Sequence, residues 1–80
     1  MNIKEHFFKE NGYNTVLGSP INYEELVVYI WINGEEVALV QKEEGPDKIV
    51  VEFFGEPIKT KIYYDVFLEA LQAAKEELLR

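Results

Sequence analysis

The dipeptide Asn33-Gly34 constrains the fold of this sequence more than any other feature, because apolar, β-rich runs flank it on both sides. A two-residue type I′ turn requires positive φ at both central positions, which asparagine tolerates and glycine adopts without steric cost. Residues 25–32 and 35–42 are therefore predicted to pair as the two strands of a β-hairpin.

This turn predicts a register in which Ile32 lies opposite Glu35 and Ile30 lies opposite Val37. Since side chains alternate along a strand, the register sorts the hairpin into two chemically different faces. The predicted aliphatic face consists of Leu26, Val28, Ile30, Ile32, Val37 and Leu39, and the predicted aromatic face consists of Val27, Tyr29, Trp31, Ala38 and Val40.

A third strand is predicted over 48–54, after a turn at 43–47. Pairing Lys48 opposite Lys42 keeps the two faces sorted, because it adds Ile49, Val51 and Phe53 to the aliphatic face and Val50, Glu52 and Phe54 to the aromatic face. Alternation over 58–62 also fits a short fourth strand at the sheet edge, where its two lysines would discourage further pairing.

Two helical segments flank the predicted sheet. Residues 3–10 are expected to form a short helix, with Asn2 and Glu5 as a reciprocal N-terminal cap and Gly12 in the left-handed position after its end. The period over 64–79 is helical, Asp65 suits the N-terminus of that helix, and its apolar stripe comprises Phe67, Leu68, Leu71, Ala74 and Leu78.

Residues 13–23 are predicted to form a loop with at most one short extended piece. The elements together predict a single α+β domain over residues 1–80 in the order α-β-β-β-(β)-α. Its antiparallel sheet has three or four strands, and the C-terminal helix packs on the aliphatic face.

The excess of acidic over basic charge lies entirely in residues 16–56, which contain the predicted sheet. The net charge is −7, and residues 16–56 hold nine acidic side chains against only Lys42 and Lys48. Such a field repels nucleic acid phosphates and anionic membranes and attracts cationic partners. We therefore expect a basic protein partner, with no direct nucleic acid binding and no membrane association.

Cysteine is absent, which excludes disulfides, thiolate metal sites and a cysteine nucleophile and fits a cytoplasmic protein. His6 is the only histidine, and Ser19 is the only serine, so a nucleophilic triad is not expected. Glu52 is the one carboxylate predicted to have an apolar setting, beside Val50, Phe54 and Ala38. We expect no enzyme activity and no cofactor.

A hard-cation site formed by Glu24, Glu43 and Asp47 is a third alternative, because Ca²⁺ and Mg²⁺ take oxygen ligands. These residues lack the alternating spacing of a calcium-binding loop. A small metal-dependent enzyme is accordingly the least favoured function.

The sharper candidate site is the predicted aromatic face. Its interface candidates are the anchors Tyr29, Trp31 and Phe54 and the steering charges Glu35, Glu36, Glu43 and Glu44. Two interpretations stay open. Either Phe7, Phe8 or Leu17 covers this face as a second small core, or the face is exposed and binds a partner.

The predicted order α-β-β-β-α resembles that of double-stranded-RNA-binding domains, in which the last helix begins with basic residues. Here Lys59 and Lys61 precede a neutral start at Tyr63-Tyr64-Asp65. The C-terminal part, ending in residues 69–76, is similar to small HicB-type antitoxins. Both are likenesses of fold, and no specific motif carries either of them.

The sequence therefore predicts a small, acidic, non-enzymatic protein-interaction module of prokaryotic or phage type. It would act as an immunity protein, antitoxin or nuclease inhibitor does, by occluding a basic partner. A homo-oligomeric structural domain, such as a homodimer, is the main alternative.

Overall fold

The computed structural model describes residues 12–54 and 62–80. The predicted helix over 3–10, with His6, and most of the predicted strand over 58–62 lie outside these ranges. Ile62 is described and does not belong to a strand. Five elements follow along the chain: β1 (Tyr13–Gly18), β2 (Val27–Ile32), β3 (Glu35–Gln41), β4 (Val50–Phe53) and α2 (Tyr64–Leu78).

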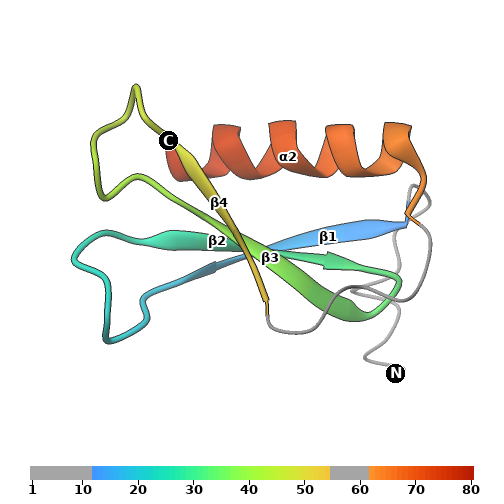
Figure 1. The fold of residues 1–80 in the computed structure, drawn as a ribbon, viewed down its shortest axis with the longest axis horizontal. Coiled ribbons are helices and arrows are strands. Elements are labelled where there is room, and N and C mark those ends of the chain that lie inside the picture. Colours follow the sequence, from blue (N-terminus) through green and yellow to red (C-terminus); the bar gives the residue numbers. More distant parts are fainter. Residues whose placement is uncertain (1–11, 55–61) are drawn as a thin grey trace.

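The four strands form one antiparallel sheet in the order β1-β2-β3-β4, and α2 lies along one of its faces (Figure 1). This is the α+β architecture that the sequence predicts. The helix contacts β1, β2 and β3, so β4 is the strand that it covers least.

Strand β1 is the largest departure from the expected elements. It occupies residues for which the sequence predicted a loop with little extended structure, and it pairs along its whole length with β2, from Tyr13 opposite Ile32 to Gly18 opposite Val27. Asparagine and glycine within YNTVLG weaken its local strand propensity. Pairing with the strongly β-forming β2 therefore supplies what the local sequence lacks.

The hairpin turn is confirmed. Asn33 has φ of 51° and Gly34 has φ of 81°, which are the positive values that a type I′ turn demands. Ile32 lies opposite Glu35, and Trp31 lies opposite Glu36, as predicted.

Beyond Trp31 the predicted register is wrong by one residue. Ile30 lies opposite Ala38 instead of Val37, because a β-bulge places Val37 as an extra residue in β3. The same shift continues to β4, where Gln41 lies opposite Val50. An extra residue reverses the facing of everything that follows it in the strand, so Ala38 and Val40 face α2.

Leu39 consequently points to the opposite side of the sheet, where it lies between Tyr29 and Glu52 in the ladder. It was expected on the aliphatic face. The facing of β2 and β4 is as predicted, because the two strands on either side of β3 pair with it through the same shift.

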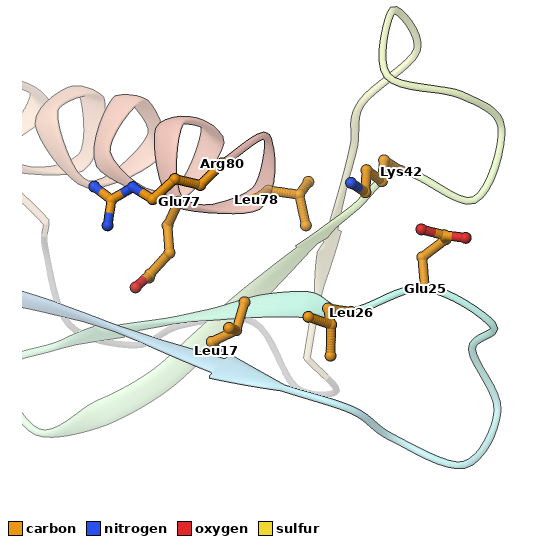
Figure 2. Close-up of a pocket in the computed structure, with 7 residues that line it drawn as sticks. All are labelled: Leu17, Glu25, Leu26, Lys42, Glu77, Leu78 and Arg80. Atoms are coloured by element: carbon orange, nitrogen blue, oxygen red, sulfur yellow. The ribbon is translucent and has the colours of Figure 1, made fainter.

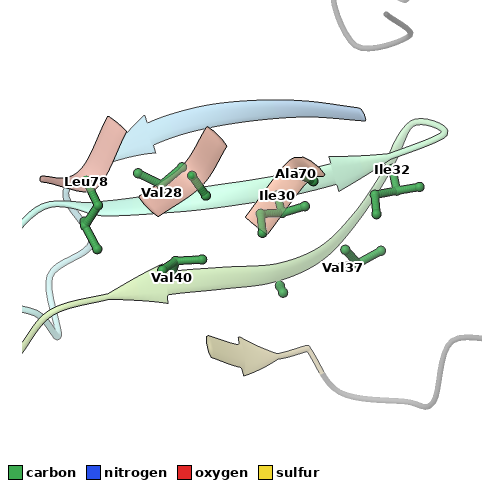
Figure 3. Close-up of a cluster of buried hydrophobic side chains, with 9 residues drawn as sticks. Val28, Ile30, Ile32, Val37, Val40, Ala70 and Leu78 are labelled. Atoms are coloured by element: carbon green, nitrogen blue, oxygen red, sulfur yellow. The ribbon is translucent and has the colours of Figure 1, made fainter. Parts of the chain in front are cut away.

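The core fills the space between the sheet and α2 (Figure 3). Val28 and Ile30 are fully buried, and Val37 and Ala38 both belong to this cluster although they are adjacent in the sequence. Consecutive residues can share a face here because the bulge interrupts the alternation. The cluster comprises Val28, Ile30, Ile32, Val37, Ala38, Val40, Ala70, Ala74 and Leu78.

Helix α2 turns a stripe of small and aliphatic residues toward the sheet. Ala70 and Ala74 have no exposed surface, and their small side chains allow a close approach of the helix to the strands. Leu68, which was expected to broaden this stripe, is 42% exposed. The N-cap residue is Tyr63, which makes no side-chain capping hydrogen bond, and Asp65 lies in the first turn, where its charge complements the helix dipole.

Candidate functional site

The face of the sheet opposite α2, called the aromatic face below, brings two of the three predicted anchors into contact. The rings of Tyr29 and Phe54 stack with centroids 6.2 Å apart and an interplanar angle of 20°. Trp31 lies two residues further along β2 on the same face and is opposite Glu36 in the ladder. All three aromatic side chains are half-buried, so each retains surface for a further contact.

Tyr29 owes its position to a glycine in the neighbouring strand. A Cβ atom built on Gly18 would lie 2.5 Å from Cε2 of Tyr29, closer than two carbon atoms can approach. The tyrosine ring therefore lies directly on the backbone of β1. The sequence gives no sign of this contact, because β1 was not expected as a paired strand.

The end of the aromatic face at the β1–β2 loop is closed. Val27 has no exposed surface, and Leu39 and Gln41 are also buried. Leu17 lies opposite Val28 and so belongs to the side that faces α2, which rules it out as the cover that the sequence suggested. Phe7 and Phe8 lie outside the described residues.

A polar network occupies the part of this face beside Glu52. Oε1 of Glu52 accepts a 2.8 Å hydrogen bond from the Tyr23 hydroxyl, and Oε2 accepts one of 2.8 Å from Nε2 of Gln41. Oε1 of Gln41 accepts the backbone N–H of Glu43 at 2.8 Å. The expected apolar setting of Glu52 is wrong, since two neutral donors bind its carboxylate and Ala38 lies on the other side of the sheet.

The hydrogen bond to Glu52 raises the pKa of the Tyr23 hydroxyl, with smaller contributions from desolvation and from the nearby negative charge. Deprotonation of Tyr23 would remove the donor and place an anion beside the carboxylate. The network therefore keeps Tyr23 neutral and holds the β1–β2 loop against β4.

Glu43 extends the network to the same loop. Its Oε1 accepts the backbone N–H of Glu24 at 3.1 Å, and its Oε2 accepts that of Glu25 at 2.8 Å. A carboxylate that accepts two backbone donors fixes the loop much as a capping residue fixes a helix end. Glu43 thus has a structural role in addition to the charge that the sequence assigned to it.

The predicted steering charges do not form one patch. Glu35 and Glu36 are exposed at the hairpin end of β3, whereas Glu43 and Glu44 are exposed beyond its other end. The stacked rings of Tyr29 and Phe54 lie between these two acidic ends.

The alternative cation site does not assemble. Within residues 12–54 and 62–80, no three aspartate, glutamate or histidine side chains come together as metal ligands would. Glu24 and Glu43 are neighbours, but the contact between them is a hydrogen bond from backbone to carboxylate.

For the described ranges, no helix combines the length and the apolar character that crossing a bilayer requires. Comparison of the chain with protein-family models, curated proteins and solved structures gave no significant match.

Proposed function

We propose that this protein is a non-enzymatic protein-interaction module that binds a basic protein partner through its aromatic face. The observation that carries the proposal is the stacked pair of Tyr29 and Phe54 beside half-buried Trp31. Tyrosine and tryptophan offer large, rigid contact areas with few rotatable bonds, which is why they dominate the binding energy of protein interfaces.

The charge distribution supports a basic partner. Glu36 lies opposite Trp31 at one end of the aromatic face, exposed Glu35 adjoins it at the hairpin turn, and Glu44 lies beyond the other end of β3; the chain as a whole carries a net charge of −7. Exposed charges around an interface accelerate the approach of an oppositely charged protein more than they tighten the final complex.

A role in occlusion fits these features best. An immunity protein, antitoxin or nuclease inhibitor acts by covering a basic surface, so it needs a rigid contact face and acidic charge and no catalytic group. We place such a protein in the cytoplasm of a prokaryote or in a phage, because a chain without cysteine needs no oxidising compartment for disulfides.

The test is to cross-link the tagged protein to its partner at low salt, identify that partner, and measure binding kinetics with both proteins purified. Tyr29→Ala should accelerate dissociation, because it removes an anchor. Glu36→Lys should slow association severalfold, and the difference should fade as salt is added.

Glu76→Lys, an equal change of charge on an exposed residue of α2, is the matched control and should affect association less than Glu36→Lys does. The proposal fails if no partner is captured. It also fails if the complex with Tyr29→Ala dissociates as slowly as the wild-type complex and has the same affinity.

Self-association is a second candidate, and exposed apolar side chains near β4 favour it. Phe53 is 62% exposed although its ring lies 6.1 Å from that of Phe67, and Tyr64 and Leu68 are exposed on the adjoining part of α2. The ring contact between Phe53 and Phe67 joins β4 to this part of the helix, and exposed apolar side chains that lie together mark interfaces. Sedimentation equilibrium of the wild type and of Phe53→Glu separates the two functions, since only a dimer formed here would dissociate in the variant.

A further inference from the structure

A small pocket opens where the last turn of α2 meets the strand ends, and its lining is chemically mixed. It has a volume of about 220 Å³ and is lined by Leu17, Glu25, Leu26, Lys42, Glu77, Leu78 and Arg80. Figure 2 shows that these residues come from four separate segments: β1, the end of the β1–β2 loop, the residue after β3, and the C-terminal end of the helix. The pocket is separate from the aromatic face.

One wall of the pocket is aliphatic and incompletely covered. Leu17 and Leu26 are 46% and 48% exposed, whereas Leu78 behind them is buried. Figure 2 shows the side chains of Leu17 and Leu26 below the last turn of the helix. A branched aliphatic group seated here would remove both leucine surfaces from water, which is the main source of affinity in small apolar sites.

Glu77 belongs to the polar part of the pocket, and one oxygen of its carboxylate is buried. Among the described residues, Oε1 of Glu77 has no hydrogen-bond donor. A buried acceptor without a partner destabilises the folded chain, and one on a carboxylate does so more strongly than a neutral one. An ammonium group in the pocket would place the opposite charge beside the Glu77 carboxylate.

The lining also carries positive charge. The ammonium group of Lys42 points toward the last turn of α2, whereas the guanidinium group of Arg80 extends on the side of Glu77 (Figure 2). With Glu25 and Glu77 the lining holds two cations and two anions. A purely cationic ligand would meet Lys42 and Arg80, and a purely anionic one would meet the two glutamates.

We propose that this pocket binds a small zwitterion with a branched aliphatic group, that is, an aliphatic α-amino acid of the size of leucine. Its ammonium group donates to Glu77, its carboxylate pairs with Lys42, and its side chain packs on Leu17 and Leu26. The volume is below the roughly 300–1,000 Å³ of sites for drug-sized ligands and suits a molecule of this size. Glu43 holds the loop that provides Glu25 and Leu26, so the pocket is built by the fold itself.

The proposal is tested by an NMR titration of the full chain with three probes of similar shape. L-leucine carries both charges, isopentylamine lacks the carboxylate, and isocaproate lacks the ammonium group. Leucine should cause saturable shifts in the amide signals of Leu17, Leu26 and Leu78. Each of the other two probes should bind at least about tenfold more weakly, because each loses one charged hydrogen bond.

Glu77→Gln should weaken leucine binding by about tenfold, since it removes the charge that pairs with the ammonium group. Glu76→Gln removes an equal charge from the adjacent, exposed position and should bind leucine as the wild type does. A thermal melt shows whether both variants are folded. The proposal is overturned if leucine causes no saturable shift, if isopentylamine binds as tightly as leucine, or if the two variants have equal affinities.

Discussion

The Tyr23 hydroxyl donates a 2.8 Å hydrogen bond to Oε1 of Glu52, and this contact fastens the β1–β2 loop to strand β4, which is not its neighbour in the sheet. Gln41 and Glu43 continue the connection through β3 and back to the same loop. The loop is therefore held at two points, Tyr23 and Glu25, by one hydrogen-bond network. Both the aromatic face and the pocket beside α2 depend on where that loop lies.

The pH dependence of stability should reveal the Tyr23–Glu52 contact. The folded-state pKa of Tyr23 is raised above its ordinary value near 10, so its contribution to the free energy of unfolding is complete below about pH 10. It is lost as the pH rises through the raised pKa. Urea titrations at increasing alkaline pH should show a steeper loss of stability for the wild type than for Tyr23→Phe.

Tyr63→Phe provides the control, because Tyr63 is 82% exposed at the start of α2. It should keep the alkaline behaviour of the wild type. If Tyr23→Phe and Tyr63→Phe behave alike at every pH, the hydrogen bond to Glu52 does not contribute to stability.

Removing the Glu43 carboxylate should loosen the β1–β2 loop. In Glu43→Ala the N–H groups of Glu24 and Glu25 lose their acceptor, and their hydrogen exchange should accelerate by about tenfold. Glu44→Ala removes the same side chain one position later and should leave those two amides unchanged. Equal exchange in the two variants would contradict the role assigned to Glu43.

Truncation of the core should be costly and truncation of Leu68 should not. Ile30 is fully buried between the sheet and α2, so Ile30→Ala should lower the free energy of unfolding by about 2–5 kcal/mol. Leu68→Ala removes an exposed side chain and should change it by about 0.5 kcal/mol or less. Chemical denaturation measures both, and a large effect of Leu68→Ala would show that the helix packs differently.

Gly18→Ala should disturb the stacked rings of the aromatic face. The added methyl group would lie 2.5 Å from Cε2 of Tyr29, so the ring must move away from β1 and from its position against Phe54. We expect a destabilisation of about 1–3 kcal/mol and altered near-ultraviolet circular dichroism.

The matched control is Ser19→Ala, at the exposed neighbouring position. It should leave the spectrum unchanged. An unchanged spectrum in Gly18→Ala would mean that the tyrosine ring does not rest on the β1 backbone.

The sequence predicted the fold class, the hairpin turn and the helix on one face of the sheet, because each has a strong local signal. Asn33-Gly34 predicts the hairpin turn, and the helical period of the C-terminal residues predicts α2. Strand β1 has no such local signal. It is a strand because its backbone hydrogen bonds are made by pairing with β2, which is a tertiary contact. The sequence does not indicate the bulge at Val37 either. Because Val37 is an extra apolar residue in an apolar run, the alternation of side chains fits two registers equally well.

The candidate site was predicted in part for the same reason. Tyr29 and Phe54 were placed on one face from alternation alone, and the structure brings their rings together. The network around Glu52 depends on a loop residue, Tyr23, whose position no local pattern specifies. Gln41, a polar residue at the end of an otherwise apolar run, was the available sign that this face holds polar partners.

The extra residue at Val37 also lets one short strand serve two sides of the molecule. Before this residue, Glu36 lies beside Trp31 on the aromatic face, where a binding partner could contact both. After it, Ala38 and Val40 face the helix. If Val37 instead took an ordinary place in the ladder, strict alternation from Glu36 would turn Leu39 toward the helix and turn Ala38 and Val40 away from it. One irregular residue thus determines which side chains of β3 face the helix and which lie on the aromatic face.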